Sequence, residues 1–286
     1  MKTATATASA AAVSAVAGAT PFYMPASPGE RFCLFHQPAS GRPSRGAILY
    51  VHPFAEELNK SRRMAALQAR AFADAGYSVL QIDLYGCGDS SGDFVNARWH
   101  IWKRDLVLAC EWLAKRVDAP LTIWGLRLGA LLALDLANRA PLPLARIVLW
   151  HPVFKGKTHL DQFLRLRQAG RMLAGAGADA GGGTSARQEL AAGAALEVAG
   201  YELAPELAAA IDSQDASSLA LPFPLLWFES AAADGNVAPA AAHQAASWRA
   251  AGAVLTLHPV HGETFWSSTE VLECPSLLAA TAATFA

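Results

Sequence analysis

Short apolar runs alternate with longer amphipathic segments along most of this chain. The runs are rich in β-branched and aromatic residues and predict strands at residues 31–37, 46–52, 77–84, 121–124, 146–150, 225–229 and 253–258. Apolar positions three and four residues apart predict helices between them at residues 61–75, 99–117, 128–138, 239–250 and 276–285. This alternation predicts an α/β protein with a doubly wound, mainly parallel sheet.

One segment, residues 154–218, interrupts the alternation. It is Ala-rich, contains the tract Gly181–Gly183 and shows no strand pattern over about 60 residues, which is long for an ordinary loop. We expect an inserted helical cap with a flexible Gly tract. The cap divides the core into a first part, residues 21–153, and a second part, residues 219–286.

The N-terminal residues 1–20 are rich in Ala, Thr and Ser, a composition that predicts a disordered tail. The alternative is a weak signal peptide, because Ala10–Ala17 is faintly apolar and Val16–Ala19 roughly suits cleavage. The apolar stretch is short and poor in Leu, which favours the tail.

Composition and charge narrow the class of function. The 286 residues are 53% hydrophobic and 16% charged, enough apolar material for one large core. The formal net charge is −1, which argues against nucleic-acid binding because such proteins usually carry a basic excess. No apolar run reaches the roughly 18 residues of a transmembrane helix.

The four cysteines, Cys33, Cys87, Cys110 and Cys274, are scattered and lack the spacing of metal ligands. Such scatter is typical of reduced thiols in the cytosol. We therefore expect a cytoplasmic protein without a bound metal or other cofactor.

The segment around Arg127 has the framework of a nucleophile elbow. A buried strand leads to Gly125, and a helix begins directly after Arg127 and continues through Gly129. Two glycines suit a turn so tight that a Cβ at either place would collide with its neighbours. The middle residue of such a turn is normally the attacking group, but the guanidinium of Arg127 is not a nucleophile.

Polar residues that follow the other strands are candidates for the same site, because ligands bind beyond the carboxyl ends of parallel strands. Asp234 and His261 follow the last two strands in the order acid, then His. A carboxylate that holds one imidazole nitrogen leaves the other free as a general base. The plainer interpretation is a surface His and a turn Asp, since Asp-Gly-Asn is ordinary turn chemistry. Glu229 and His258 are substitutes for this pair.

The turn His52-Pro53-Phe54 lies where an oxyanion hole would form. Pro53 has no N–H group, so the N–H groups of Phe54 and Leu128 would be the donors. We therefore count His52, Phe54 and Leu128 with Arg127 as substrate-binding candidates. The alternative is a strand-ending turn without a catalytic part.

Arg127 itself has two interpretations. At a helix N-terminus its guanidinium can clamp a carboxylate or phosphate, or it can pair with Asp234, Glu56 or Asp83 and plug the site. The cations of Asn59–Arg63 either bind an anion or form a solvated face balanced by Glu56 and Glu57. Ser90, Ser91 and Cys87 in the Gly-rich loop are alternative nucleophiles, although turn roles are favoured.

Three stretches carry a family resemblance: HPFAEELNKSRRM at residues 52–64, QIDLYGCGDSSGDF at residues 81–94 and WGLRLG at residues 124–129. They resemble the exosortase A system-associated hydrolase, type 2, within the α/β-hydrolase superfamily, and the resemblance covers residues 21–265. It implies an α/β-hydrolase fold in a bacterial protein linked to exopolysaccharide production and protein sorting. It also implies that Arg at the elbow belongs to the family pattern.

These features lead to a functional hypothesis and an alternative from another class. In the first, His261, oriented by Asp234, activates water, and Arg127 holds an anionic ester, thioester or phosphorylated glycan-lipid substrate. The partners would then be a small-molecule or lipid-linked anionic substrate and exopolysaccharide-system proteins. In the alternative, the chain is a non-catalytic ligand-binding or partner protein that uses the same pocket.

Overall fold

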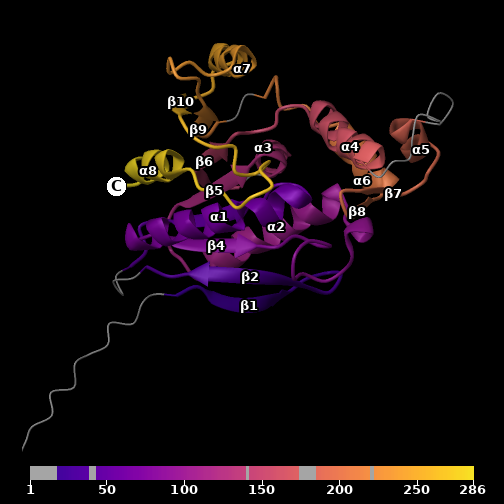
Figure 1. Ribbon diagram of the computed structural model, residues 1–286. Helices are drawn as coiled ribbons and strands as arrows, with labels where there is room; N and C mark the ends of the chain where they lie inside the picture. The colour runs from indigo at the N-terminus through magenta and orange to yellow at the C-terminus, as the bar shows by residue number, and fades with distance from the viewer. Residues whose placement is uncertain (1–17, 39–42, 140–141, 174–184, 220–221) are drawn as a thin grey trace, which may run out of the picture.

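The computed structural model describes residues 18–38, 43–139, 142–173, 185–219 and 222–286. Within these ranges the central sheet has eight strands in the order β1-β2-β4-β3-β5-β6-β9-β10 (Figure 1). The strands are β1 (Thr20–Pro25), β2 (Glu30–His36), β3 (Ala47–Val51), β4 (Ser78–Ile82), β5 (Leu121–Leu126), β6 (Leu144–Trp150), β9 (Leu225–Ser230) and β10 (Leu255–Val260). Neighbours from β4 to β10 are parallel, and β1 and β2 pair antiparallel. The predicted mainly parallel α/β class is confirmed.

Helices cover both faces of this sheet. They are α1 (Glu56–Asp74), α2 (Trp99–Ala114), α3 (Leu128–Arg139), α4 (Gly156–Leu173), α5 (Ala186–Ala191), α6 (Pro205–Asp212), α7 (Pro239–Ala250) and α8 (Pro275–Ala283), with a short 3-10 helix, η1 (Phe94–Asn96). Alternate residues of β3 point to opposite faces, so Ile48 joins the core under α1 and α8 while Leu49 joins the core under α2 and α3. Because both cores are apolar, the central strands read as continuous hydrophobic runs.

The segment between β6 and β9 contains α4, α5, α6 and a two-stranded hairpin, β7 (Leu196–Val198) and β8 (Tyr201–Leu203). These elements lie together beyond the carboxyl ends of the central strands (Figure 1). The hairpin is a departure from the expected all-helical cap, because strands of three residues are too short to give a periodic pattern. The tract Gly181–Gly183 falls outside the described residues. We call residues 156–212 the cap segment, and its independence as a domain stays a prediction.

Strand β1 begins at Thr20, inside the predicted tail, and was not expected. Its apolar residues anchor it: Phe22 stacks on Trp112 with ring centroids 4.7 Å apart, and Met24 is buried. Residues 1–17, which carry most of the predicted tail and the alternative signal peptide, lie outside the described residues. In the part that is described, no helix is long and apolar enough to cross a membrane.

Candidate active site

A tight turn joins β5 to α3 at the carboxyl end of a central strand. Its middle residue, Arg127, has φ +54°, a left-handed conformation that costs an L-residue roughly 1–2 kcal/mol. A Cβ at Gly125 would lie 2.5 Å from the Cα of Ala130, and a Cβ at Gly129 would overlap the carbonyl oxygen of His52. The turn therefore needs both glycines, and together they place Arg127 at the sheet edge.

The guanidinium of Arg127 is held on three sides. Its Nε lies 3.3 Å from Oε1 of Glu57, and its Nη1 donates to the carbonyl oxygen of His151 at 3.4 Å. Its central carbon lies 5.3 Å from the centre of the Trp266 ring, within range of a cation–π interaction. The Arg127 side chain remains 20% exposed, so part of the guanidinium can still meet a ligand.

The observed partner of Arg127 differs from the three expected ones, which were Asp234, Glu56 and Asp83. Asp83 instead binds Arg62, with Nη2 and Oδ2 3.0 Å apart. Arg63 pairs with Glu273. Two of the cations in Asn59–Arg63 are therefore neutralised within the protein. The carboxylate that pairs with Arg127 at the elbow is that of Glu57.

A cavity of about 190 Å³ lies over Arg127. It is lined by Phe54, Glu56, Glu57, Arg127, His159, Gln162, Phe163, Leu166, Trp266 and Ser267. These residues come from the start of α1, the elbow, helix α4 of the cap segment and the loop after β10. The site is therefore shared between the core and the cap segment.

Two carboxyl groups at the first turn of α1 line this cavity, that of Glu57 buried and that of Glu56 half-buried. Burial raises the pKa of Glu57 to about 7, more than the nearby Arg127 lowers it. Burial also raises the pKa of Glu56. The Oε2 atoms of both residues are buried and lack a hydrogen-bond partner among the described groups. A carboxyl that titrates near neutral pH is suited to accept and return a proton.

His159 enters the cavity from α4 and was not a candidate in the sequence analysis. Its side chain is buried, and neither ring nitrogen has a hydrogen-bond partner in the described structure. Burial lowers its pKa to about 3, so the imidazole is neutral. Its ring meets Phe54 edge-on at 5.8 Å. A lone His in an Ala-rich segment gives no sequence signal for this placement.

A buried His–carboxylate pair lies behind Arg127. Nδ1 of His151 is 3.3 Å from Oε1 of Glu229, and the His151 ring lies 4.3 Å from that of Trp266. Burial lowers the pKa of His151, and its hydrogen bond to Glu229 lowers the pKa of that carboxyl. The substitute acid Glu229 thus binds His151, whereas the substitute base His258 stacks on Phe228 at 4.6 Å.

The predicted pair of Asp234 and His261 is not joined by a hydrogen bond in the described residues. Asp234 is fully exposed and accepts the backbone N–H of Asn236 at 3.0 Å and its side-chain amide at 2.9 Å. These bonds hold the pKa of Asp234 low, and His261 lies close enough to contribute. The carboxylate that was expected to orient the imidazole of His261 is therefore hydrogen-bonded within its own turn.

The predicted oxyanion-hole residues have different surroundings. Both ring nitrogens of His52 are occupied, with Nδ1 2.7 Å from the Pro53 carbonyl and Nε2 accepting the Leu84 N–H at 3.2 Å. His52 therefore holds the backbone, and its role in binding substrate stays a prediction that these contacts do not favour. The Phe54 ring lines the cavity, and Leu128 begins α3 beside it. None of the backbone hydrogen bonds between described residues has the Phe54 or Leu128 N–H as donor.

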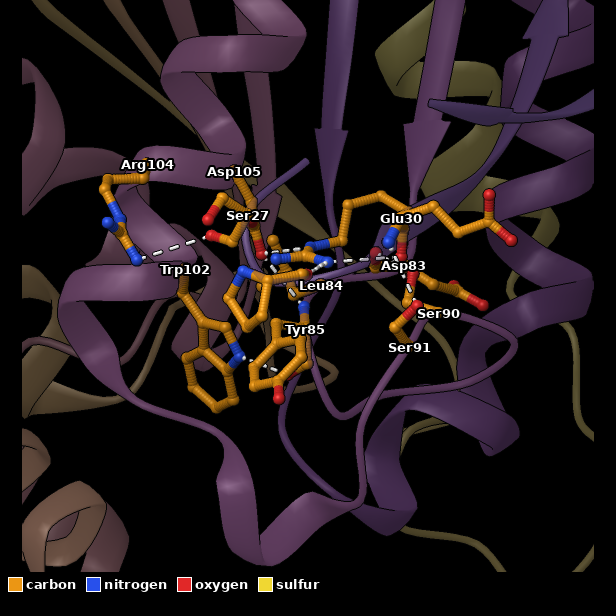
Figure 2. Close-up of polar contacts among 12 residues, drawn as sticks. Ser27, Glu30, Asp83, Leu84, Tyr85, Ser90, Ser91, Trp102, Arg104 and Asp105 are labelled. Atoms are coloured by element: carbon orange, nitrogen blue, oxygen red, sulfur yellow. Dashed lines mark hydrogen bonds and ion pairs between the residues drawn. The ribbon is translucent and has the colours of Figure 1, made fainter. Parts of the chain in front are cut away.

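The Gly-rich loop is fixed by its own polar residues (Figure 2). Oγ of Ser90 accepts the Phe32 N–H at 2.9 Å and donates to the Asp83 carbonyl, and Oγ of Ser91 accepts the Glu30 N–H at 3.0 Å. The Cys87 thiol is buried, which raises its pKa. These contacts support the turn roles of the three residues over nucleophilic ones.

Comparison with known proteins places this geometry in context. The family described as serine aminopeptidase, S33, matches residues 42–188, just over half of the chain. No curated protein sequence matches. The elbow position of this chain holds Arg127, although the family name refers to a serine.

Solved structures share the fold at low sequence identity. Est1E from Butyrivibrio proteoclasticus with ferulic acid bound is 14% identical, with a TM-score of 0.65 over 92% of this chain and 96% of that one. Proline iminopeptidase from Mycobacterium smegmatis is 13% identical, with a TM-score of 0.62 over 93% of this chain and 97% of that one. A carboxyl esterase from Bacillus coagulans in complex with glycerol is 12% identical, with a TM-score of 0.60 over 93% and 97%. Fold and family model agree, and the chain belongs to the serine aminopeptidase S33 family of the α/β-hydrolase superfamily.

Proposed function

We propose that this chain hydrolyses a small anionic ester or thioester in the cavity over Arg127, with water as the attacking group. The observation that carries the proposal is the pairing of Arg127 with Glu57 at the elbow, 3.3 Å apart, in a cavity that also contains unpartnered polar atoms. Arg127 supplies the positive charge for the anion, and Glu57 supplies a group that titrates near neutral pH. The ester class follows the esterases among the similar structures.

In the proposed reaction the Glu57 carboxylate takes a proton from water while the water oxygen attacks the substrate carbonyl. The N–H groups of Phe54 and Leu128 donate to the oxygen that becomes negative. The bond from carbonyl carbon to ester oxygen then breaks, and Glu57 returns its proton to the departing alkoxide. The products are a carboxylic acid and an alcohol, and no covalent enzyme intermediate forms.

The walls of the cavity suit the rest of such a substrate. Phe163 and Trp266 are buried, and Leu166 on α4 is 41% exposed at the same site. These side chains can cover an aliphatic or aromatic acyl group while Arg127 holds its anionic end. His261 stays the second candidate for the base, but its exposure and the lack of a hydrogen bond to Asp234 among the described contacts favour Glu57.

A pair of chromogenic esters tests the proposal. We expect the mono-4-nitrophenyl ester of glutaric acid to be hydrolysed faster than the neutral 4-nitrophenyl valerate, because only the first carries a carboxylate for Arg127. Fluorophosphonate probes should not label the protein, since no Ser stands at the elbow. Stoichiometric labelling mapped by peptide mass spectrometry to Ser90 or Ser91 would contradict the mechanism.

The alternative is a non-catalytic protein that binds an anionic ligand in the same cavity. It is favoured by the occupation of the nucleophile position by an already paired Arg127. Glutarate binding by calorimetry without turnover of either ester would select this alternative. The association with exopolysaccharide production and the exosortase A system rests on the resemblance alone, and loss of exopolysaccharide on deleting the gene in its host would support it.

A further inference from the structure

His159 is a buried imidazole without a hydrogen-bond partner in a cavity that the core and the cap segment share. Both of its ring nitrogens are inaccessible to solvent and unpartnered among the described groups. Burying a polar group without a hydrogen bond destabilises the folded state. Other buried side chains, such as Gln68, also lack partners, but His159 does so where a cavity can admit a water molecule or a ligand as its partner.

His52 provides a comparison within the same molecule. It is also buried, but its two ring nitrogens bind the Pro53 carbonyl and the Leu84 N–H. Its surroundings show how this fold accommodates an imidazole that only supports the structure. His159 lacks such backbone partners, and it lines the cavity over Arg127.

The chemistry of a neutral imidazole defines what His159 can do there. Burial is the larger cause and the positive charge of Arg127 the smaller cause of its low pKa, so the ring does not gain a second proton at neutral pH. A neutral imidazole has one N–H donor and one acceptor nitrogen. Beside a guanidinium and two carboxyl groups, it is suited to donate a hydrogen bond to a carbonyl oxygen of the ligand.

We propose that His159 is a substrate-contacting residue that donates a hydrogen bond to the carbonyl oxygen of the anionic ester in the cavity over Arg127. This inference rests on the proposed function and deepens it, because it makes helix α4 of the cap segment part of the catalytic site. The donor is already in place because the cap segment packs on the turn after β3, where the ring centroids of Phe54 and Phe163 lie 4.9 Å apart.

Variants of His159 test this inference on the mono-4-nitrophenyl glutarate ester. His159→Phe keeps an aromatic ring and removes the donor, and we expect kcat to fall by about 10²-fold or more, the usual effect of losing one such donor. His159→Gln supplies an amide N–H and should restore about a tenth or more of the wild-type rate. The pH profile should keep its shape, because the proposed donor does not titrate near neutral pH.

Thermal melts separate this role from a structural one. His159→Phe should leave the melting temperature unchanged or raise it, since it removes two unpartnered polar atoms. The matched variant His52→Phe should lower it, because the Leu84 N–H loses its acceptor. Full activity of His159→Phe, or a large drop in its melting temperature, would overturn the inference.

A second measurement distinguishes failure of this inference from failure of the proposed function. If Glu57→Gln abolishes ester hydrolysis and His159→Phe does not, only the role of His159 is wrong. If the wild-type protein hydrolyses neither ester, the imidazole nitrogen signals of His159 are followed by NMR as glutarate is added. A shift of these signals supports contact with a bound carbonyl group without hydrolysis, whereas unchanged signals overturn the inference as well.

Discussion

The Gly-rich loop and the cavity over Arg127 lie near the same edge of the sheet, and both contain buried polar side chains. In the loop these side chains bind each other and the backbone: the Tyr85 N–H donates to Asp105 at 2.9 Å, and Nε1 of Trp102 donates to the Tyr85 carbonyl at 2.9 Å (Figure 2). In the cavity, Oε2 of Glu56, Oε2 of Glu57 and both ring nitrogens of His159 have no partner among the described groups.

This difference separates a structural polar network from a binding site. Satisfied buried groups rigidify a fold, whereas unsatisfied ones destabilise it unless something else supplies the hydrogen bonds. The loop network holds the chain through an ion pair as well as hydrogen bonds: Nε of Arg31 lies 2.9 Å from Oδ2 of Asp105 with both side chains buried, and Nε and Nη2 of Arg31 have no hydrogen-bond partner among the described groups. The cavity keeps hydrogen-bonding capacity for a ligand. Variants of the two regions should therefore change different properties.

The largest effect on stability is expected in the loop network. Asp105→Ala leaves the buried guanidinium of Arg31 without its carboxylate, so the free energy of unfolding should fall by about 3–5 kcal/mol. Urea unfolding measures this change. Arg104→Ala, an exposed neighbour on the same helix, is the control and should stay within about 0.5 kcal/mol of wild type. Equal effects of the two variants would refute the role of the network.

In the cavity, Glu57→Gln should change both the activity of the protein and the pH dependence of its stability. Because the pKa of Glu57 is raised to about 7, the folded state binds this proton more tightly than the unfolded chain does. The stability from the protonated carboxyl is present below about pH 4.5 and is lost as the pH rises through about 7. The free energy of unfolding of the wild type should fall by up to about 3 kcal/mol between these limits. That of Glu57→Gln should not.

The activity of the same variant sharpens the comparison. Hydrolysis by wild type should rise with pH through about 7, as Glu57 becomes a carboxylate able to accept a proton. Glu57→Gln should lower kcat by about 10²-fold or more. A Glu57→Gln enzyme that hydrolyses the anionic ester at the wild-type rate would remove Glu57 from the mechanism.

A smaller effect is expected from Arg127 at the elbow. Arg127→Ala should weaken glutarate binding by about 1.5–3 kcal/mol, and Arg127→Lys should restore this only in part, because an ammonium lacks the planar fork. Near pH 6 its stability should change little, because Glu57, with a pKa of about 7, is already mostly protonated there and leaves no unpaired charge when Arg127 is removed. Calorimetry and melts at pH 6 measure both quantities. A large loss of stability with unchanged glutarate binding would show that Arg127 only plugs the site.

The smallest effects are expected at the exposed pair. Asp234→Asn and His261→Ala should each change the free energy of unfolding by less than about 0.5 kcal/mol. Because neither is bound to the other, both should keep ester hydrolysis within a few-fold of wild type. A loss of about 100-fold in His261→Ala would instead restore the predicted His–Asp mechanism.

The sequence predicted the fold well because each strand and helix carries its own local pattern. The helix expected at residues 239–250 is α7, and the elbow glycines Gly125 and Gly129 occupy the expected turn. The site depends on contacts between distant residues, which no local pattern contains. Glu57 meets Arg127 across 70 positions of sequence, and His159 comes from a segment without periodicity. For Asp234 the local sequence did indicate the outcome, since Asn236, two residues later, is the residue that binds its carboxylate.

The left-handed conformation of Arg127 has an evolutionary consequence. Two glycines and the neighbouring strand determine this conformation, so a Ser at the same position would adopt it as well. A serine at the elbow would therefore need no change in the surrounding backbone. That substitution would not by itself create a Ser–His–Asp triad with the predicted pair, because Asp234 binds Asn236 and is not hydrogen-bonded to the imidazole of His261. The evolution of such a serine mechanism from this protein would therefore require changes both at the elbow and in the loop that holds Asp234.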